Sequence, residues 1–122
     1  MGLESYLLGK DGEKLAESYL TSRGYSIIET NFHSQQGEID IVAEESGCLV
    51  FVEVKSYSYR SYSLPVFAVK KSKKENIIHA ARYYLYKKKI RGKRCRFDVI
   101  AIYKNSKNET VIELFKNAFG VK

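Results

Sequence analysis

The run from Cys48 to Lys55 has the residue pattern of a β-strand. Valines occupy one face of this strand along its length, while Leu49 and Phe51 begin the other face. Glu53 and Lys55 continue that second face with opposite charges. A charged pair in an apolar row raises the free energy of the fold unless another group compensates it. We therefore expect the second face to be covered at one end and the charged pair to have a partner at the other.

Helix and strand patterns alternate along the rest of the chain. Apolar spacing predicts a helix from about residue 5 to 23, ended by Gly24, and a second helix that starts at a capping box formed by Ser72 and Glu75. The other expected strands span residues 25–31, 37–45, 97–103 and 110–115, and a polar loop is expected from Ser56 to Pro65.

The connections between these elements define the expected sheet. The short turn at Ser46-Gly47 makes its flanking strands antiparallel neighbours. The long helical connection that follows permits a parallel, right-handed crossover to the fourth strand. The sequence thus predicts one α/β domain over residues 1–122, a mixed five-stranded sheet flanked by helices in the order αβββαββ.

Composition limits the class of protein. A chain of 122 residues suits one domain, and no apolar run approaches the roughly 20 residues that span a bilayer. The first residues lack the basic-then-apolar order of a signal peptide, so we expect a cytoplasmic protein that does not associate with membranes. The net charge of +7 favours a polyanionic partner such as nucleic acid. The two cysteines and two histidines lack the spacing of a zinc site.

Two acids and a lysine on adjacent strands meet the chemical needs of metal-dependent phosphodiester hydrolysis. Glu53 and Lys55 share a strand face, and Asp40 lies on the preceding strand, where Ile39 and Ile41 are expected to point to the opposite face. Mg²⁺ and Mn²⁺ take oxygen ligands, and a nearby lysine can orient a water and add positive charge. A bare Glu-x-Lys also describes a surface ion pair, and the register that would bring Asp40 beside Glu53 is not readable from the sequence.

Five motifs, which cover nearly the whole chain in order, resemble the YraN-type family of bacterial proteins. They are Gly12-Glu13 with Ala16 and Tyr19-Leu20, Gly37-Glu38-Ile39-Asp40, Phe51-Val52-Glu53-Val54-Lys55, Val69 and Lys73 before Ala80-Ala81-Arg82-Tyr83-Tyr84-Leu85, and Arg96-Phe97-Asp98-Val99. This family is similar in fold to restriction-endonuclease-like and archaeal Holliday-junction-resolvase-like nucleases, so the resemblance implies a restriction-endonuclease-like fold.

The resemblance also implies a reaction and a set of site residues. It implies Asp40 and Glu53 as metal ligands, Lys55 as the catalytic lysine and Glu13 as an acid contributed by the first helix. The implied activity is that of an Mg²⁺- or Mn²⁺-dependent endonuclease that cuts DNA, including branched or single-stranded DNA. Related resolvase-like folds often dimerise, which leaves a homodimer open.

Two positions depart from the family pattern. Relatives often carry arginine where Tyr57 and His33 stand in this chain. Both changes weaken expected phosphate contacts, and neither removes an implied metal ligand. A non-catalytic nucleic-acid-binding module on a nuclease fold therefore stays open as an alternative.

Further acids have two interpretations each. Glu13 is either the helix-borne acid or a solvated acid that interacts with a helix dipole. Glu38 alternates with Asp40 and either supports the site or forms a salt bridge with a neighbour. Asp98 is expected to be structural and paired with Arg96.

Several basic and aromatic residues are candidates for nucleic-acid contacts. Lys73 lies in the first turn of a helix, an unfavourable place for a cation, which hints at a phosphate but also suits a solvated lysine. Tyr57 and Arg60 belong to a tyrosine-rich segment that could stack on bases and reach a phosphate, or could be an ordinary surface loop. The remaining candidates, which could equally be a solvated helix end, are Lys87, Lys88 and Lys89.

Overall fold

A computed structural model describes the backbone of residues 2–59 and 69–120, and the side chains of residues 12–56 and 69–120. Its elements are α1 (Gly2–Ser22), β1 (Ser26–His33), β2 (Glu38–Glu45), β3 (Cys48–Tyr59), α2 (Lys71–Lys87), β4 (Cys95–Lys104) and β5 (Thr110–Phe119). The strands form one sheet in the order β1-β2-β3-β4-β5, in which β3 and β4 are parallel and the other neighbours antiparallel. The predicted mixed sheet and the order αβββαββ are therefore confirmed.

The sheet lies between the two helices, each of which covers one core. Ala16 and Leu20 of α1 pack with Val50 and Val52 of β3. Phe51, which points to the opposite face of β3, packs against α2 in the second core. The aromatic rings of Phe51 and Tyr84 meet there edge to face, with centroids 5.8 Å apart. The predicted alternation along β3 is thus confirmed, and both faces of this central strand are covered.

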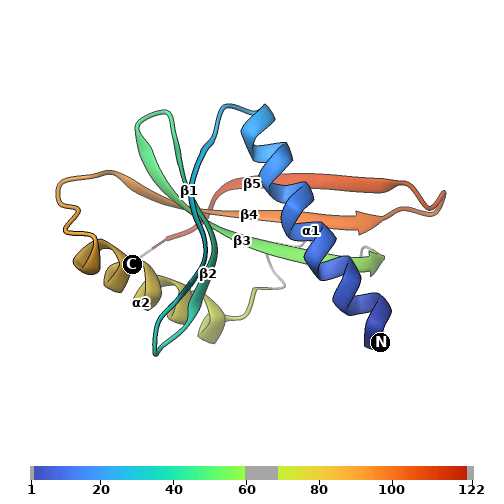
Figure 1. Ribbon diagram of the computed structural model, residues 1–122, viewed down its shortest axis with the longest axis horizontal. Helices are drawn as coiled ribbons and strands as arrows, with labels where there is room; N and C mark the ends of the chain where they lie inside the picture. Colours follow the sequence, from blue (N-terminus) through green and yellow to red (C-terminus); the bar gives the residue numbers. More distant parts are fainter. Residues whose placement is uncertain (1, 60–68, 121–122) are drawn as a thin grey trace.

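The β1–β2 hairpin runs across the direction of the other three strands, as Figure 1 shows. Asn31 has a left-handed backbone, with φ +54°, between the cross-strand pairs Thr30–Ile41 and Phe32–Ile39. The alternation of side chains holds only while both strands stay extended. The prediction that Ile39 and Ile41 share a face is wrong: Ile39 packs in the core under α2 and Ile41 in the core under α1, on either side of the point where the regular pairing of β2 with β3 ends.

Two local boundaries also differ from the sequence prediction. The capping box is wrong: α2 starts at Lys71, its N-cap is Lys70 in an extended conformation, and Ser72 lies inside the first turn. The segment from Ser56 to Tyr59, expected to open a loop, continues β3, because it pairs with β4 as far as Lys104. The terminator Gly24 and the turn at Ser46-Gly47 are confirmed, and both glycines have positive φ.

Neither of the two helices in the described part of the chain is long and apolar enough to cross a membrane.

Candidate active site

Asp40 and Glu53 face each other where β2 and β3 separate. The last regular pair between these strands is Ile41–Val52, and Asp40 and Glu53 lie one step beyond it. The backbone N–H of Val54 donates a hydrogen bond of 2.7 Å to Oδ2 of Asp40, in the place of a ladder bond between main chains. The register that the sequence left open thus brings the two carboxylates together, and the amide of Val54 fixes the orientation of Asp40.

Glu53 is the more buried of the two acids, with 5% of its surface exposed. Burial raises its pKa from 4.5 to about 8, and the hydrogen bond and negative charge of Asp40 add to this rise. The positive charges of Lys73 and Lys55 act in the opposite direction. Glu53 therefore holds a proton near neutral pH.

Both acids line a cavity of about 420 Å³ that opens to solvent. Its lining residues come from β2, β3 and the start of α2, and they are Glu38, Asp40, Glu53, Val54, Lys55, Lys70 and Lys73. Three carboxyl and three ammonium groups thus share one small space. Such a mixture can bind a cation through the acids and an anion through the lysines.

The start of α2 gives this cavity its positive side. Nζ of Lys73 lies 3.8 Å from Oε2 of Glu53, and Lys70 lines the rim. The first turn of α2 contains no acid, and no side chain of the N-cap residue bonds its N–H groups. A helix N-terminus with free amides attracts anions. Lys73 therefore adds positive charge to a helix end that already favours anions, on the side of the cavity next to Glu53.

The helix α1 brings Glu13 towards Asp40. Gly12 packs so closely on β3 that a Cβ atom there would collide with the side chain of Ser56. Burial and the negative charge of Asp40 raise the pKa of Glu13, while a hydrogen bond from Asn31 lowers it. Glu13 is therefore near enough to interact electrostatically with Asp40. It is not among the described residues that line the cavity.

Within residues 12–56 and 69–120, no three His, Cys, Asp or Glu side chains gather closely enough to hold a metal ion by themselves. Among the described residues, Asp40 and Glu53 are therefore the pair of carboxyl groups at this cavity that could bind a metal ion, with its remaining ligands from elsewhere. Glu38, the third acid of the lining, faces His33, whose Nδ1 lies 3.1 Å from its Oε2. His33, at a position where relatives often carry arginine, thus contacts an acid of the site.

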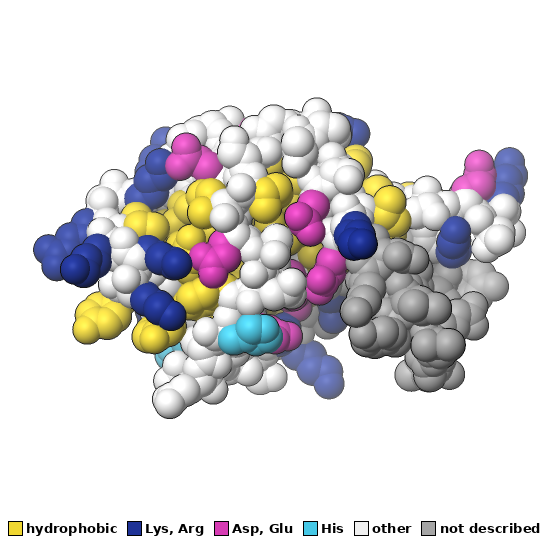
Figure 2. Space-filling view, viewed as in Figure 1, with side chains coloured by type: hydrophobic (Ala, Val, Ile, Leu, Met, Phe, Trp, Pro, Cys, Tyr) yellow, Lys and Arg dark blue, Asp and Glu magenta, His cyan; other side chains and the backbone are white. Residues whose placement is uncertain are grey.

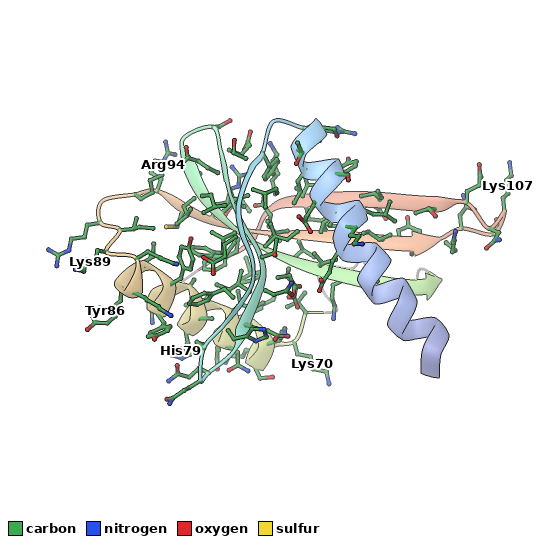
Figure 3. All side chains as sticks on the ribbon, viewed as in Figure 1. Lys70, His79, Tyr86, Lys89, Arg94 and Lys107 are labelled. Atoms are coloured by element: carbon green, nitrogen blue, oxygen red, sulfur yellow. The ribbon has the colours of Figure 1, made fainter. Side chains whose placement is uncertain are left out.

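The basic candidates at the end of α2 lie far from this cavity. Figure 3 shows Lys70 and Lys89 at opposite ends of the helix. Lys and Arg side chains gather where α2 ends and the chain turns towards β4 (Figure 2). Nζ of Lys88 there lies 3.4 Å from Oε1 of Glu29, while Lys87 lines a separate hollow. The side chain of Tyr57 and the whole of Arg60 lie outside the described residues.

Sequence analysis missed Lys70, which lines the cavity from the residue before α2. The misplaced capping box hid it, because a helix start at Ser72 leaves Lys70 two residues outside. The basic run Lys70-Lys71, followed by Lys73-Lys74, is the signal that could have indicated it.

A buried polar network lies on the face of the sheet that α1 covers, where Asp98 pairs with Val52, the residue before Glu53. Asp98 is fully buried and accepts hydrogen bonds from Arg96 at 2.9 Å, from the hydroxyl of Tyr25 at 2.8 Å and from the backbone N–H of Asn117 at 2.9 Å. Arg96 also bonds Glu45 at 2.8 Å. The predicted pairing of Asp98 with Arg96 is confirmed, and its structural role follows from its three partners, which lie on β4, on β5 and just before β1.

The fold and the cavity define an α/β protein with a mixed five-stranded sheet that holds an acid pair and lysines where two strands separate. The chain belongs to the family described as Uncharacterised protein family UPF0102, whose model matches residues 12–102. This is the YraN-type family that the sequence motifs resemble. The matched segment contains Asp40, Glu53 and all three lysines of the cavity.

Individual relatives match from 71% to 96% of the chain. A UPF0102 protein of Persephonella marina is 44% identical over 117 residues, which cover 96% of this chain and 97% of that protein. A UPF0102 protein of Caldicellulosiruptor saccharolyticus is 39% identical over 113 residues, with 92% and 96% covered. A UPF0102 protein of Nitratiruptor sp. is 47% identical over 87 residues, with 71% and 75% covered.

Proposed function

We propose that this protein is an Mg²⁺- or Mn²⁺-dependent endonuclease that hydrolyses phosphodiester bonds in DNA. The observation that carries the proposal is the pair formed by the half-buried Asp40 and the buried Glu53 in one cavity with Lys55, Lys70 and Lys73. The positive net charge of the chain supports a polyanionic substrate. The resemblance of its motifs to a nuclease superfamily supports the same conclusion.

The residues of the cavity fit a hard divalent cation. Two carboxyl groups held together with a raised pKa at Glu53 form a site in which a second negative charge is unfavourable. A cation between Asp40 and Glu53 would relieve that repulsion. Mg²⁺ is commonly held by one or two carboxylates, with water and substrate phosphate as its remaining ligands. An all-oxygen donor pair also suits Mg²⁺ or Mn²⁺ better than zinc.

Each side chain of the cavity would then have its own role in hydrolysis. When bound, the cation would lower the pKa of a bound water molecule and stabilise the charge that builds on the phosphate oxygens. Asp40 and Glu53 would hold it, with Asp40 kept in orientation by the amide of Val54. Lys55 would orient the attacking water, and Lys70 and Lys73 would bind the phosphate.

The test is cleavage of labelled single-stranded, branched and duplex DNA by purified protein with and without Mg²⁺ or Mn²⁺. Asp40→Asn and Lys55→Ala are each expected to reduce the rate by at least about 100-fold, since each removes charge from the reacting centre. Lys107→Ala is the matched control, because this lysine lies at the β4–β5 turn, away from the cavity (Figure 3). Equal rates for the three variants would overturn the proposal.

A second candidate is a nucleic-acid-binding module without catalysis. It is favoured by His33 and Tyr57, which stand where relatives often carry arginine. This candidate predicts salt-sensitive binding that persists in Glu53→Ala, and no cleavage of any substrate with either metal. Metal-dependent cleavage that disappears in Asp40→Asn would exclude it.

A further inference from the structure

Two further hollows extend from the candidate active site along the β1–β2 hairpin. The first, of about 350 Å³, shares Glu38 and Lys73 with the active-site cavity and continues past residues 33–37 to Asn76. The second, of about 540 Å³, shares residues 33–36 with the first and ends at Tyr83 and Lys87. Since each hollow shares lining residues with the next, we treat the two as one path, the hairpin groove.

One wall of the hairpin groove is a single stripe of α2. Lys73, Asn76, Tyr83 and Lys87 are spaced by three, seven and four residues, which places them on one side of a helix. Fourteen residues separate the two lysines, so they are about 21 Å apart along the axis. That length matches about six phosphate spacings of a B-form strand and fewer of an extended one.

The opposite wall is the turn of the hairpin, which rests directly on α2. A Cβ atom at Gly37 would lie 2.8 Å from the backbone oxygen of Asn76, so the two walls are held at a set distance. The turn contributes uncharged hydrogen-bonding groups from Ser34, Gln35 and Gln36. The groove thus has a cation at each end and neutral donors and acceptors between them. Its one acid, Glu38, is in contact with His33.

Tyr83 provides a flat aromatic surface in this groove. Its side chain is 42% exposed, and its ring lies against the buried ring of Phe32, with centroids 6.0 Å apart. Phe32 is itself held edge to face by Tyr84 at 5.0 Å. A braced ring with one free face can stack on a base at little entropic cost. Bases inside a duplex have both faces covered, so this kind of contact selects unpaired nucleotides.

We propose that the hairpin groove binds an unpaired nucleic-acid strand that leads to or from the reacting phosphate. A base stacks on Tyr83, backbone phosphates contact Lys73 and Lys87, and the amides of Gln35 and Gln36 contact sugars or base edges. The link to a reacting phosphate rests on the proposed function, whereas the binding of the strand does not. The groove narrows the substrate class to nucleic acids with a single-stranded segment.

The test measures binding in EDTA, where no metal-dependent cleavage interferes, by fluorescence anisotropy. The probes are a labelled single-stranded DNA, a single-stranded RNA of the same sequence and the corresponding DNA duplex. Tyr83→Leu keeps an apolar contact with Phe32 and removes the stacking face, so it is expected to weaken single-strand binding by roughly tenfold with little effect on duplex binding. Tyr83→Phe is expected to bind as the wild type does.

Matched controls lie on the same helix. Tyr86 is 80% exposed, is not part of the hairpin groove and points outward at the far end of α2 (Figure 3). Tyr86→Leu is expected to leave binding unchanged, and Lys87→Ala is expected to weaken it more than Lys89→Ala does. Equal effects at Tyr83 and Tyr86, equal losses for single strand and duplex at Tyr83→Leu, or no binding of either single strand would overturn the proposal.

Failure of this proposal can be told apart from failure of the proposed function. If the protein cleaves DNA in a metal-dependent way but Tyr83→Leu binds single strands as the wild type does, only the proposal for the hairpin groove is overturned. Single-strand binding that depends on Tyr83, in a protein that cleaves nothing, would support the groove and overturn the endonuclease. Binding of the RNA and not the DNA probe, again dependent on Tyr83, would support the groove and overturn DNA as the substrate.

Discussion

The carboxyl group of Glu53 determines how the candidate active site responds to pH. Asp40, Glu53 and Lys55 were predicted from short motifs. Glu53 and Lys55 are two residues apart on β3, where the alternation of side chains holds, and Asp40 lies on the strand that precedes β3 in the sequence. The raised pKa of Glu53 was not predictable, since it depends on the burial of this side chain and on Asp40 of the neighbouring strand β2. Lys70 escaped prediction for a similar reason, because its place at the rim depends on where the helix starts.

The raised pKa of Glu53 leads to a prediction about stability. Since the pKa is about 8 in the folded protein and 4.5 for an ordinary glutamate, the stabilisation by the protonated group is complete below about pH 4.5 and is lost as the pH rises to about 8. Glu53→Gln mimics the protonated carboxyl group and removes this dependence. We expect the melting temperature of the wild type to fall relative to that of Glu53→Gln across this range in EDTA.

Differential scanning calorimetry of both proteins from pH 4 to pH 9 measures this difference, with one scan rate used throughout because the melting temperature can depend on it. Added Mg²⁺ at the upper end of the range is expected to stabilise the wild type more than the variant. Parallel curves for the two proteins would contradict the assigned pKa.

At the scale of elements, the contact between the β1–β2 hairpin and α2 sets the shape of both the active-site cavity and the hairpin groove. The sequence predicted each element separately from its apolar spacing and its turn residues. It did not predict that the hairpin would rest on the helix, because Gly37 has no side chain to indicate a contact. The close approach of Gly37 to Asn76 became visible only with both elements in place.

This contact predicts a clear effect of Gly37→Ala. The added methyl group would meet backbone and Cβ atoms of Asn76 at 2.8–3.1 Å, and these atoms cannot move without the helix. We expect a loss of about 1–3 kcal/mol in the free energy of unfolding, the usual cost of forcing an extra group into a packed region. Urea denaturation measures it.

Gly120→Ala is the control for this substitution, since no atom of the described residues lies within 4 Å of a Cβ placed there. It is expected to change the free energy of unfolding by less than about 0.5 kcal/mol. Equal stabilities of the two variants would mean that the hairpin and α2 can separate freely.

Across the whole molecule, the two faces of the sheet differ in how their polar groups are satisfied. On the α1 face, Arg96 and Asp98 form a network with partners from β2, β5 and the residue before β1. On the α2 face, the two acids Asp40 and Glu53 meet in a cavity that is open to solvent. A satisfied network fixes the strands in place, whereas an unsatisfied one is suited to bind a ligand.

The network predicts a large effect of Asp98→Ala on stability. Removing this fully buried carboxylate leaves the guanidinium of Arg96 and the hydroxyl of Tyr25 without their main partner. Breaking one side of a buried ion pair typically costs about 3–5 kcal/mol. Chemical denaturation of Asp98→Ala and of the double variant with Arg96→Met tests this origin.

The double variant is expected to recover part of the lost stability, because it removes the guanidinium that has lost one of its two carboxylate partners. Strictly additive losses in the two substitutions would show that the residues act independently. Nuclease or binding assays of Asp98→Ala, run well below its melting temperature, are expected to give wild-type values, since Asp98 lies on the face of the sheet opposite to that of Glu53.

The sequence alone determined the kinds and order of the elements and the acids and lysine of the site. These follow from local periods of two and 3.6 residues and from turn residues such as Gly24 and Ser46-Gly47. Only the tertiary structure decided that β2 and β3 separate beyond Ile41–Val52, that Asp40 bonds the amide of Val54, and that Ile39 packs on the α2 side. Register and bending depend on hydrogen bonds and packing between residues distant in sequence, which local periodicity does not encode.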